Sequence, residues 1–107
     1  MKIYDKGITQ MYCGYWNGSP LEVGLIPTIF KVPEREVLHS HPYREYYVII
    51  AGKGLLIING KEVELAPNNV VMVEPYEKHE VTWVDPHEGI RWVIIKEKSD
   101  PNGKIVH

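Results

Sequence analysis

The chain is a series of short apolar or alternating runs, each ended by turn-forming residues. No window keeps apolar residues at positions i, i+3, i+4 and i+7, so the pattern predicts no helix. Asn59-Gly60 separates two strand-like runs as a two-residue type I′ turn requires. The runs that we expect to form strands are Pro27–Val32, Glu36–His41, Glu45–Ala51, Gly54–Ile58, Lys61–Ala66, Val70–Val73, His79–Val84 and Ile90–Lys96.

Short strands at regular spacing, with no helices between them, predict an all-β fold. We expect an antiparallel double-sheet β-barrel of the jelly-roll type, an arrangement that protects the sheet edges. A chain of 107 residues suits one such domain and is too short for two, so residues 1–107 are expected to form a single domain. The polar tail at 99–107 is expected to lie on the surface.

Two of the runs, Leu55–Ile58 and Val70–Val73, are apolar at consecutive rather than alternate positions. Both faces of these strands are therefore expected to be covered. One face would meet the barrel interior. The other would meet either the N-terminal segment of the same chain or a second copy of the protein, so a homodimer is one of two open interpretations.

Composition and charge exclude several classes of protein. The chain is 44% hydrophobic and 24% charged, and 12 Lys and Arg against 14 Asp and Glu give a net charge of −2. It has no clustered basic patch for nucleic acid, and no apolar run reaches the roughly 18 residues that span a membrane. Residues 1–7 carry no signal-peptide core, so we expect a cytoplasmic protein. The single cysteine, Cys13, is interpreted as a quiet buried thiol.

The residues that carry chemistry are three histidines and one glutamate. Alternation along a strand places His39 and His41 on one face. After the bend that Pro42 favours, Glu45 can open the next strand facing the same cavity. His79 starts a later strand, which can bring a third imidazole from the opposite wall. Three imidazoles and one carboxylate, with no thiolate, suit a divalent first-row metal.

The identity of the metal stays open, because these ligands suit iron, manganese, nickel, zinc, cobalt or copper. Four protein ligands would complete a tetrahedral zinc site, but they would leave two open positions on an octahedral iron, manganese, nickel or cobalt ion. Open positions admit substrate or dioxygen, which metal-ion catalysis requires.

In these residues the sequence resembles the cupin superfamily, over about residues 33–96. The first cupin motif, HxH followed by Glu and then Gly, is matched in full by His39, His41, Glu45 and Gly52. The second motif is matched at Pro75 and His79. The resemblance implies a small β-barrel and assigns the three histidines and the glutamate to a metal.

The second motif also departs from the family pattern. The Pro-to-His spacing is one residue short, and Asn69, Glu77 and Trp83 stand where Gly, Gly and Asn are usual. These are turn or packing positions, so the ligands are retained. The resemblance does not choose a reaction, because the superfamily includes dioxygenases, sugar isomerases and epimerases, decarboxylases, lyases and non-catalytic binding modules.

Alternation also predicts which side chains line the cavity. An inward Glu45 implies an inward Tyr47, and an inward His79 implies an inward Trp83, so both rings are expected beside the metal as a substrate pocket. Trp92 and Phe30 are expected in the core. The roles of four residues stay open: Arg44 and Arg91, which could pair with an anionic substrate, and the loop residues Glu77 and His87, which could transfer protons.

We therefore expect a metal-binding small cupin and favour a metal-dependent enzyme acting on a small molecule inside the barrel. The reaction would be dioxygenase-like or sugar isomerase- or epimerase-like, and the absence of a His–Asp dyad outside the metal set favours chemistry centred on the metal. The alternative is a non-catalytic module that binds a sugar or other small ligand. In a third interpretation the metal only stabilises a small barrel.

Overall fold

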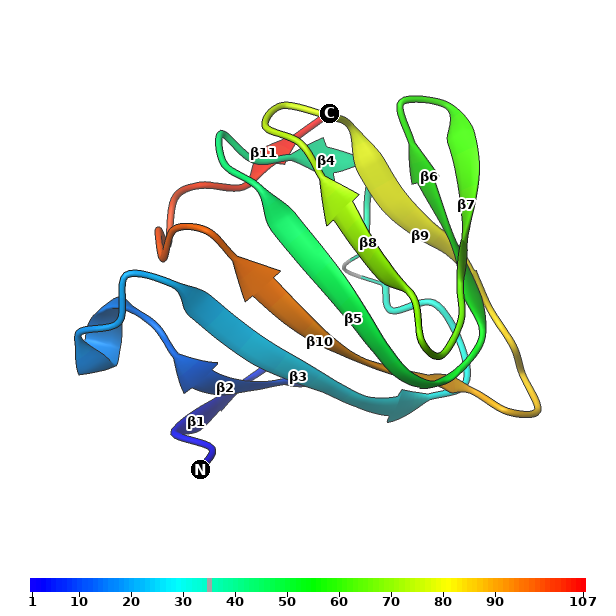
Figure 1. Cartoon of the computed structure of the whole chain (residues 1–107), viewed down its shortest axis with the longest axis horizontal. Helices are drawn as coiled ribbons and strands as arrows, with labels where there is room; N and C mark the ends of the chain where they lie inside the picture. Colours follow the sequence, from blue (N-terminus) through cyan, green and yellow to red (C-terminus); the bar gives the residue numbers. More distant parts are fainter. Residues whose placement is uncertain (35) are drawn as a thin grey trace.

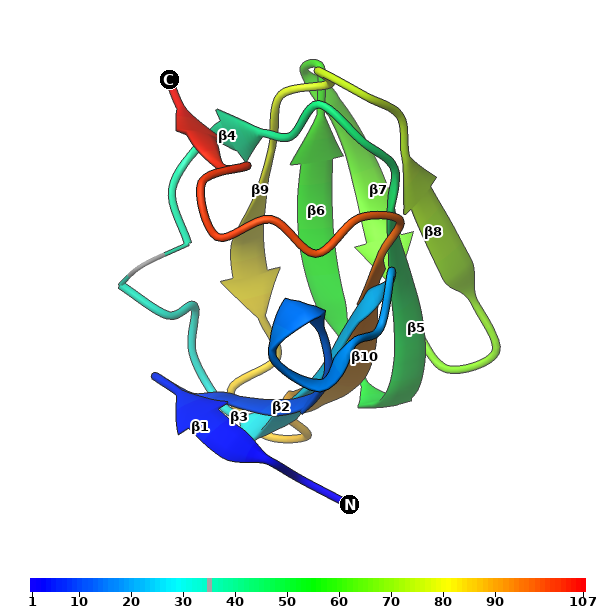
Figure 2. The same ribbon diagram turned by 90° about the vertical axis from the view of Figure 1, so that its left-hand side faces the viewer.

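Two antiparallel β-sheets face each other in the computed structural model, which describes residues 1–34 and 36–107 (Figure 1, Figure 2). The six-stranded sheet contains, in spatial order, β1 (Tyr4–Lys6), β2 (Thr9–Cys13), β3 (Glu22–Ile29), β10 (Ile90–Lys96), β5 (Glu45–Gly52) and β8 (Val70–Val73). The five-stranded sheet contains β11 (Ile105–Val106), β4 (His39–Ser40), β9 (His79–Val84), β6 (Gly54–Ile58) and β7 (Lys61–Leu65). The predicted all-β double-sheet fold is confirmed, although the two sheets do not join into a closed barrel.

The local turns follow from the sequence pattern. Asn59 and Gly60 have φ angles of 48° and 81°, so the β6–β7 hairpin turns through two left-handed residues as the Asn-Gly pair predicts. The described part of the chain contains one short 3-10 turn, Tyr15–Asn17, and no α-helix. No helix there is long and apolar enough to cross a membrane.

The core lies between the sheets and is built from the inward positions of each strand. Trp92 is 2% exposed and confirms its predicted core position. Phe30 is 55% exposed, so its predicted core position is wrong. The reason is that β3 ends at Ile29, one residue before Phe30, and the alternation that would turn this ring inward ends with the strand.

The N-terminal half of the larger sheet was not anticipated. β3 begins at Glu22, five residues before the expected start at Pro27, and it pairs with the unpredicted strand β2. Pro27 has no amide hydrogen to donate to a neighbouring strand, and its position in β3 requires none. On one side, β2 pairs with β3 only as far as Leu25. On the other side, the β3–β10 register shifts between Ile90 and Trp92, opposite the proline. These strands form the wall of the fold that faces the histidines.

The segments around the histidines are shorter strands than expected. Of the predicted strand Glu36–His41 only His39–Ser40 is in a ladder. The tail supplies the partner: β11 pairs with β4, and the Ser40 hydroxyl lies 2.7 Å from His107 Nε2. The C-terminal residues therefore help to hold the strand on which the histidine pair sits.

Candidate metal centre

The three histidines come together at one end of the space between the sheets. His39 in β4 and His79 at the start of β9 are direct partners in the register, and His41 follows two residues after His39. Glu45, the first residue of β5, approaches from the other sheet. None of these four side chains belongs to a residue more than 5% exposed, so the group is almost completely removed from water.

The distances suit a shared ion. One ring nitrogen from each of His39, His41 and His79 lies within 4.8 Å of the others, so the three rings could hold a metal. Glu45 Oε2 is 2.9 Å from His41 Nε2, and Oε1 is 3.8 Å from His79 Nε2. A carboxylate therefore stands beside two of the three imidazoles.

Backbone carbonyls fix the tautomers of two rings. Nδ1 of His39 lies 2.5 Å from the Val37 carbonyl oxygen, and Nδ1 of His79 lies 2.8 Å from that of Glu77. A carbonyl only accepts, so each Nδ1 carries the proton and donates it. Nε2 of each ring then carries a lone pair, the state that a metal ligand needs.

Several polar atoms in the cluster are buried without a hydrogen-bond partner. They are His41 Nδ1 and Nε2, His79 Nε2 and Glu45 Oε2. Although His41 Nε2 and Glu45 Oε2 are close, their geometry does not make a hydrogen bond. Each such atom costs about 1–3 kcal/mol when left unpaired. An ion bound among them would satisfy three of the four, so the residues present fit a metal.

The surroundings shift the pKa values of three of these side chains. Burial would raise the pKa of Glu45, but the adjacent His41 and His79 rings and the Lys96 ammonium hold that pKa well below its usual range. Burial lowers the pKa of His39 to about 4, so this ring is neutral at pH 7. Glu45 is thus an anion and His39 a neutral ring, as metal binding requires. Burial would lower the pKa of His79, but the adjacent Glu45 carboxylate raises it, so a metal would take the place of the proton on that ring.

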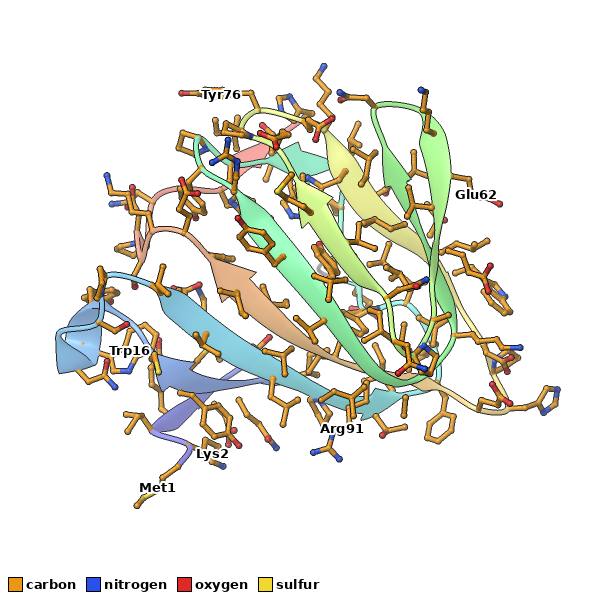
Figure 3. The ribbon with its side chains drawn as sticks, viewed as in Figure 1. Met1, Lys2, Trp16, Glu62, Tyr76 and Arg91 are labelled. Atoms are coloured by element: carbon orange, nitrogen blue, oxygen red, sulfur yellow. The ribbon has the colours of Figure 1, made fainter. Side chains whose placement is uncertain are left out.

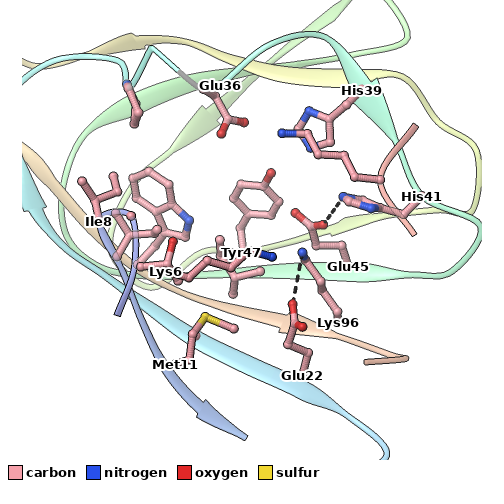
Figure 4. A pocket seen from close by; sticks show the side chains of 18 of the residues that line it. Lys6, Ile8, Met11, Glu22, Glu36, His39, His41, Glu45, Tyr47 and Lys96 are labelled. Atoms are coloured by element: carbon pink, nitrogen blue, oxygen red, sulfur yellow. Dashed lines mark ion pairs between the residues drawn. The ribbon is translucent and has the colours of Figure 1, made fainter. Parts of the chain in front are cut away.

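A cavity of about 420 Å³ opens beside the histidines. Tyr47 and Trp92 form part of its wall as stacked rings, with centroids 6.3 Å apart. Glu36 and Tyr47 point into it from different sides (Figure 4). The Lys6–Thr9 turn of the β1–β2 hairpin also lines it. The remaining lining residues include Met11, Gly24, Ile26, Ile94 and Lys104.

An ion pair crosses the wall of the cavity. Lys96 Nζ lies 3.2 Å from Glu22 Oε2, and in the register Lys96 stands between Glu22 on β3 and Glu45 on β5. The three side chains therefore form a row of alternating charge that ends at the histidines (Figure 4). Glu22 is 7% exposed, which makes the lysine its necessary counter-charge.

The structure separates the two predicted pocket rings. Tyr47 lines the cavity, but Trp83 is 42% exposed and is not in the lining. The cause is a β-bulge in β9. Leu55 of β6 pairs with Trp83 and Leu56 pairs with Val81, so Thr82 is an extra residue in β9. The alternation of side chains counted from His79 therefore reverses at this point. The expectation that Trp83 lies in the pocket does not hold in this structure.

The four residues left open by the sequence all lie outside the cavity lining. Arg44 is paired with Glu74 and Glu97 on the surface. Arg91 is exposed, and its side chain points outward from the sheet (Figure 3). Glu77 and His87 belong to turns. The Glu77 carboxylate accepts a hydrogen bond from the Glu74 amide, and the His87 amide donates one to the Asp85 carboxylate. Cys13 is half-buried.

Several cavity residues escaped the sequence analysis, among them the charged residues Glu22, Glu36 and Lys96. Alternation from Trp92 through Ile94 would have placed Lys96 inward. Glu22 lies before the expected strand Pro27–Val32. Glu36 begins the expected strand Glu36–His41, in which it would alternate away from His39, but it lies in the connection before β4. Burial and the nearby Glu45 carboxylate raise the pKa of Glu36, and its Oε1 accepts from the Val81 amide at 3.4 Å.

Comparison with known proteins identifies the family. The model of the cupin domain matches residues 28–96, most of the chain, so the protein belongs to the cupin family. No curated protein matches. Solved structures share the fold. A cupin protein from Bacteroides fragilis is 27% identical, with 78% of this chain and 70% of that chain covered and a TM-score of 0.62. A cupin-like protein from Thermotoga maritima is 25% identical, with 82% of this chain and 65% of that chain covered and a TM-score of 0.68. A third structure, from Ralstonia eutropha and named "putative mannose-6-phosphate isomerase", is 18% identical, with 87% of this chain and 84% of that chain covered and a TM-score of 0.69.

Proposed function

We propose that the protein is a metal-dependent cupin enzyme that acts on a small polar molecule in the cavity. His39, His41, His79 and Glu45 would hold the metal, through Nε2 of His39 and His79, a ring nitrogen of His41 and a carboxylate oxygen. The observation that carries the proposal is the set of buried, unpartnered ligand atoms on His41, His79 and Glu45 at the end of the 420 Å³ cavity. When bound, a divalent first-row ion there would act as a Lewis acid on a substrate oxygen.

Glu36 supplies the acid–base group that the sequence analysis lacked. Its carboxyl group faces the cavity (Figure 4), and the raised pKa brings it closer to neutral pH, where a carboxyl group can both accept and donate a proton. The Val81 amide holds one of its oxygens and leaves the other for a substrate. This arrangement favours a proton-transfer reaction over oxygen chemistry.

In the proposed step Glu36 is the side chain that removes and returns the proton. Its carboxylate takes a proton from a carbon beside a carbonyl group. The C–H bond breaks, its electron pair forms the C=C bond of an enediolate, and the electron pair of the C=O π bond moves onto the carbonyl oxygen as a negative charge. Return of the Glu36 proton to the former carbonyl carbon, while the hydroxyl proton of the first carbon passes to the oxygen anion and a new C=O bond forms at the first carbon, gives the isomer. The solved structure from Ralstonia eutropha named as an isomerase agrees with this class, although its identity is only 18%.

A non-catalytic binding module is the second candidate. The observation in its favour is the stacked Tyr47–Trp92 wall, because aromatic faces bind sugar rings, together with the Trp92 Nε1–H, which is buried without a partner and could donate to a ligand. Such a module would bind the same molecules without changing them. Turnover therefore separates the two candidates.

The experiment is exchange of substrate hydrogen with solvent. Protein loaded with each divalent metal in turn is incubated in D₂O with small aldoses, ketoses and their phosphates, and the products are followed by proton NMR. The proposal predicts deuterium at the carbon beside the carbonyl group and loss of at least about 100-fold in this rate for Glu36→Gln. If the sugar changes the NMR signals of the protein but exchanges no hydrogen with solvent for any metal, the result would instead support the binding module.

A further inference from the structure

The wall that the larger sheet gives to the cavity changes from charged to apolar along its length. Its inward side chains form cross-strand rows that are two residues apart along each strand. The first row, at the histidine end, is Glu22, Lys96 and Glu45, the second is Met11, Gly24, Ile94 and Tyr47, and the third is Ile26 and Trp92. At about 3.3 Å for each residue of β3, the third row lies about 13 Å from the first.

The second and third rows offer few partners to a hydroxyl group. Tyr47 holds the one side-chain oxygen of these two rows, and Trp92 holds the one side-chain nitrogen, which is buried. Thr9 brings its methyl group to this wall, 2.7 Å from where a Cβ atom of Gly24 would lie. A ligand with a hydroxyl group on every carbon would leave several of them unpaired here, and each unpaired group costs binding free energy. The oxygen atoms of a ligand that fills the cavity therefore belong at the histidine end.

The other charged groups of the lining lie at the mouth of the cavity. Apart from the histidines, the first row and Glu36, the charged residues among the described lining residues are Lys6, Glu34 and Lys104. All three are exposed. Their charged ends can stay in water while an apolar group passes between them, because a long side chain can keep only its stem against an apolar surface.

The apolar path continues outside the cavity. A second hollow of about 350 Å³, here called the outer groove, is lined by Ile8, Ile29, Phe30, Lys31 and Pro33. Ile8 and Pro33 line both hollows, so the outer groove adjoins the cavity. In Figure 4, Ile8 lies at the opposite end of the cavity from His39 and His41. Ile8 is 45% exposed and Phe30 is 55% exposed, so both offer apolar surface to a ligand.

We propose that the substrate is amphipathic, with an oxygen-bearing head at the metal and an aliphatic chain that runs along β3 into the outer groove. Strand β3 begins with Glu22 in the charged row and ends with Ile29 in the outer groove, so one strand follows the whole path. The path is longer than a single ring, which favours a chain. Burial of that chain against Ile94, Ile26 and Ile8 would remove apolar surface from water.

This inference rests on the proposed function and narrows its substrate to a hydroxy-carbonyl compound with an aliphatic chain. Small aldoses and ketoses would fill only the histidine end of the cavity. They can still exchange hydrogen there, but they leave the second and third rows and the outer groove without a ligand. The chain is thus expected to increase affinity without changing the chemistry at the head.

The test is a series of probes with one head and chains of increasing length. Acetohydroxamic, hexanohydroxamic and decanohydroxamic acid bind a first-row ion through the same two oxygen atoms, so differences among them report the chain alone. Each acid is titrated into cobalt(II)-loaded protein, and the visible absorption of the cobalt ion is followed. Each buried methylene group should raise affinity about three- to fourfold, so decanohydroxamic acid is expected to bind at least about 100-fold more tightly than acetohydroxamic acid.

Two variants locate the chain. Ile8→Ser and Phe30→Ser are each expected to reduce the ratio of these two affinities at least about fivefold, because each removes apolar surface from the path. Leu21→Ser is the matched control, since Leu21 is 42% exposed and lines neither hollow, and it is expected to keep the wild-type ratio. Circular dichroism establishes that the three variants are folded.

Two results would overturn the proposal and leave the metal site intact. The first is equal affinity for the three acids. The second is a gain with chain length that neither Ile8→Ser nor Phe30→Ser reduces, because the chain would then lie elsewhere. If the protein binds no cobalt, or if no acid changes the cobalt spectrum, the proposed function fails first and this inference fails with it.

Discussion

His39 and His79 are direct cross-strand partners, and each ring donates its Nδ1 proton to the backbone carbonyl two residues earlier, Val37 for one and Glu77 for the other. The same local contact occurs in two segments 40 residues apart in the chain. It leaves both Nε2 lone pairs free within the group of ring nitrogens that lie within 4.8 Å of one another. The backbone therefore prepares the site for an ion before any ion arrives.

Replacing Glu36 by Gln is expected to stabilise the protein at neutral pH. The pKa of Glu36 is raised in the folded protein, so folding favours its protonated form, and that contribution is present at low pH and is lost as pH rises through the folded pKa. Gln can still accept from the Val81 amide and has no charge to lose. Chemical unfolding from pH 4 to 8 should show Glu36→Gln gaining on wild type as pH rises.

Equal pH dependence of the two proteins would mean that Glu36 titrates normally. A loss of stability at all pH values would mean that its contact with Val81 requires the charge. A variant that is more stable but fails to exchange substrate hydrogen would fit a group retained for function at a cost to stability.

The row Glu22–Lys96–Glu45 predicts a non-additive pair of substitutions. Lys96→Met alone is expected to lower the free energy of unfolding by about 2–4 kcal/mol, because it leaves Glu22 as a buried carboxylate without its counter-charge. Adding Glu22→Gln removes that charge and should recover more than half of the loss. Urea unfolding of the two single variants and the double variant measures the coupling. Simple addition of the two single effects would contradict the account.

Gly52 is expected to tolerate no side chain. Its φ angle is +82°, and a Cβ atom would lie 1.9 Å from the Gly89 carbonyl oxygen, a backbone atom that cannot move aside cheaply. Gly60 has nearly the same φ, +81°, with nothing within 4 Å of its Cβ position. Gly60→Ala therefore carries the strain of the dihedral angle alone, about 1–2 kcal/mol.

Gly52→Ala should cost at least about 2 kcal/mol more than Gly60→Ala, since the backbone at Gly89 must also shift. Thermal unfolding of the two variants side by side makes the comparison. Similar melting temperatures would show that the β5–β6 turn can open, and that Gly52 of the first cupin motif is kept for its dihedral angle only.

The histidine cluster was predictable from sequence because its spacing follows strand geometry. His39 and His41 share a face by alternation, and Glu45 and His79 each open a strand, so two short segments fix the group. Trp83 was misplaced by the same rule, because the extra residue Thr82 in β9 reverses the alternation and leaves no sign in the sequence. Glu36 was missed because the expected strand Glu36–His41 would turn it to the face opposite His39, whereas it lies in the connection before β4 and reaches the cavity from there.

The limits of the fold prediction have the same origin. Strands β5 to β10 carry regular apolar runs and were placed within a residue or so of their ends. β1 and β2 alternate weakly, and β4 and β11 have two residues each, so their pairing depends on contacts distant in sequence. The consecutive apolar residues of Val70–Val73 left open whether the N-terminal segment covers the outer face of this strand, and the path of the N-terminal hairpin, whose turn lines the cavity, could not be predicted from them.

The central claim is tested most directly by elemental analysis of untagged protein purified without chelator, beside His41→Ala. Both ring nitrogens of His41 lack a hydrogen-bond partner, so removal of this ring should leave the sheets folded. Ser40→Ala is the neighbouring control, because its hydroxyl contacts His107 and not the cluster. Wild type and Ser40→Ala are expected to hold about one equivalent of a first-row metal, and His41→Ala is expected to lose at least tenfold in metal affinity. Full occupancy in His41→Ala, or no metal in wild type even after reconstitution, would contradict it.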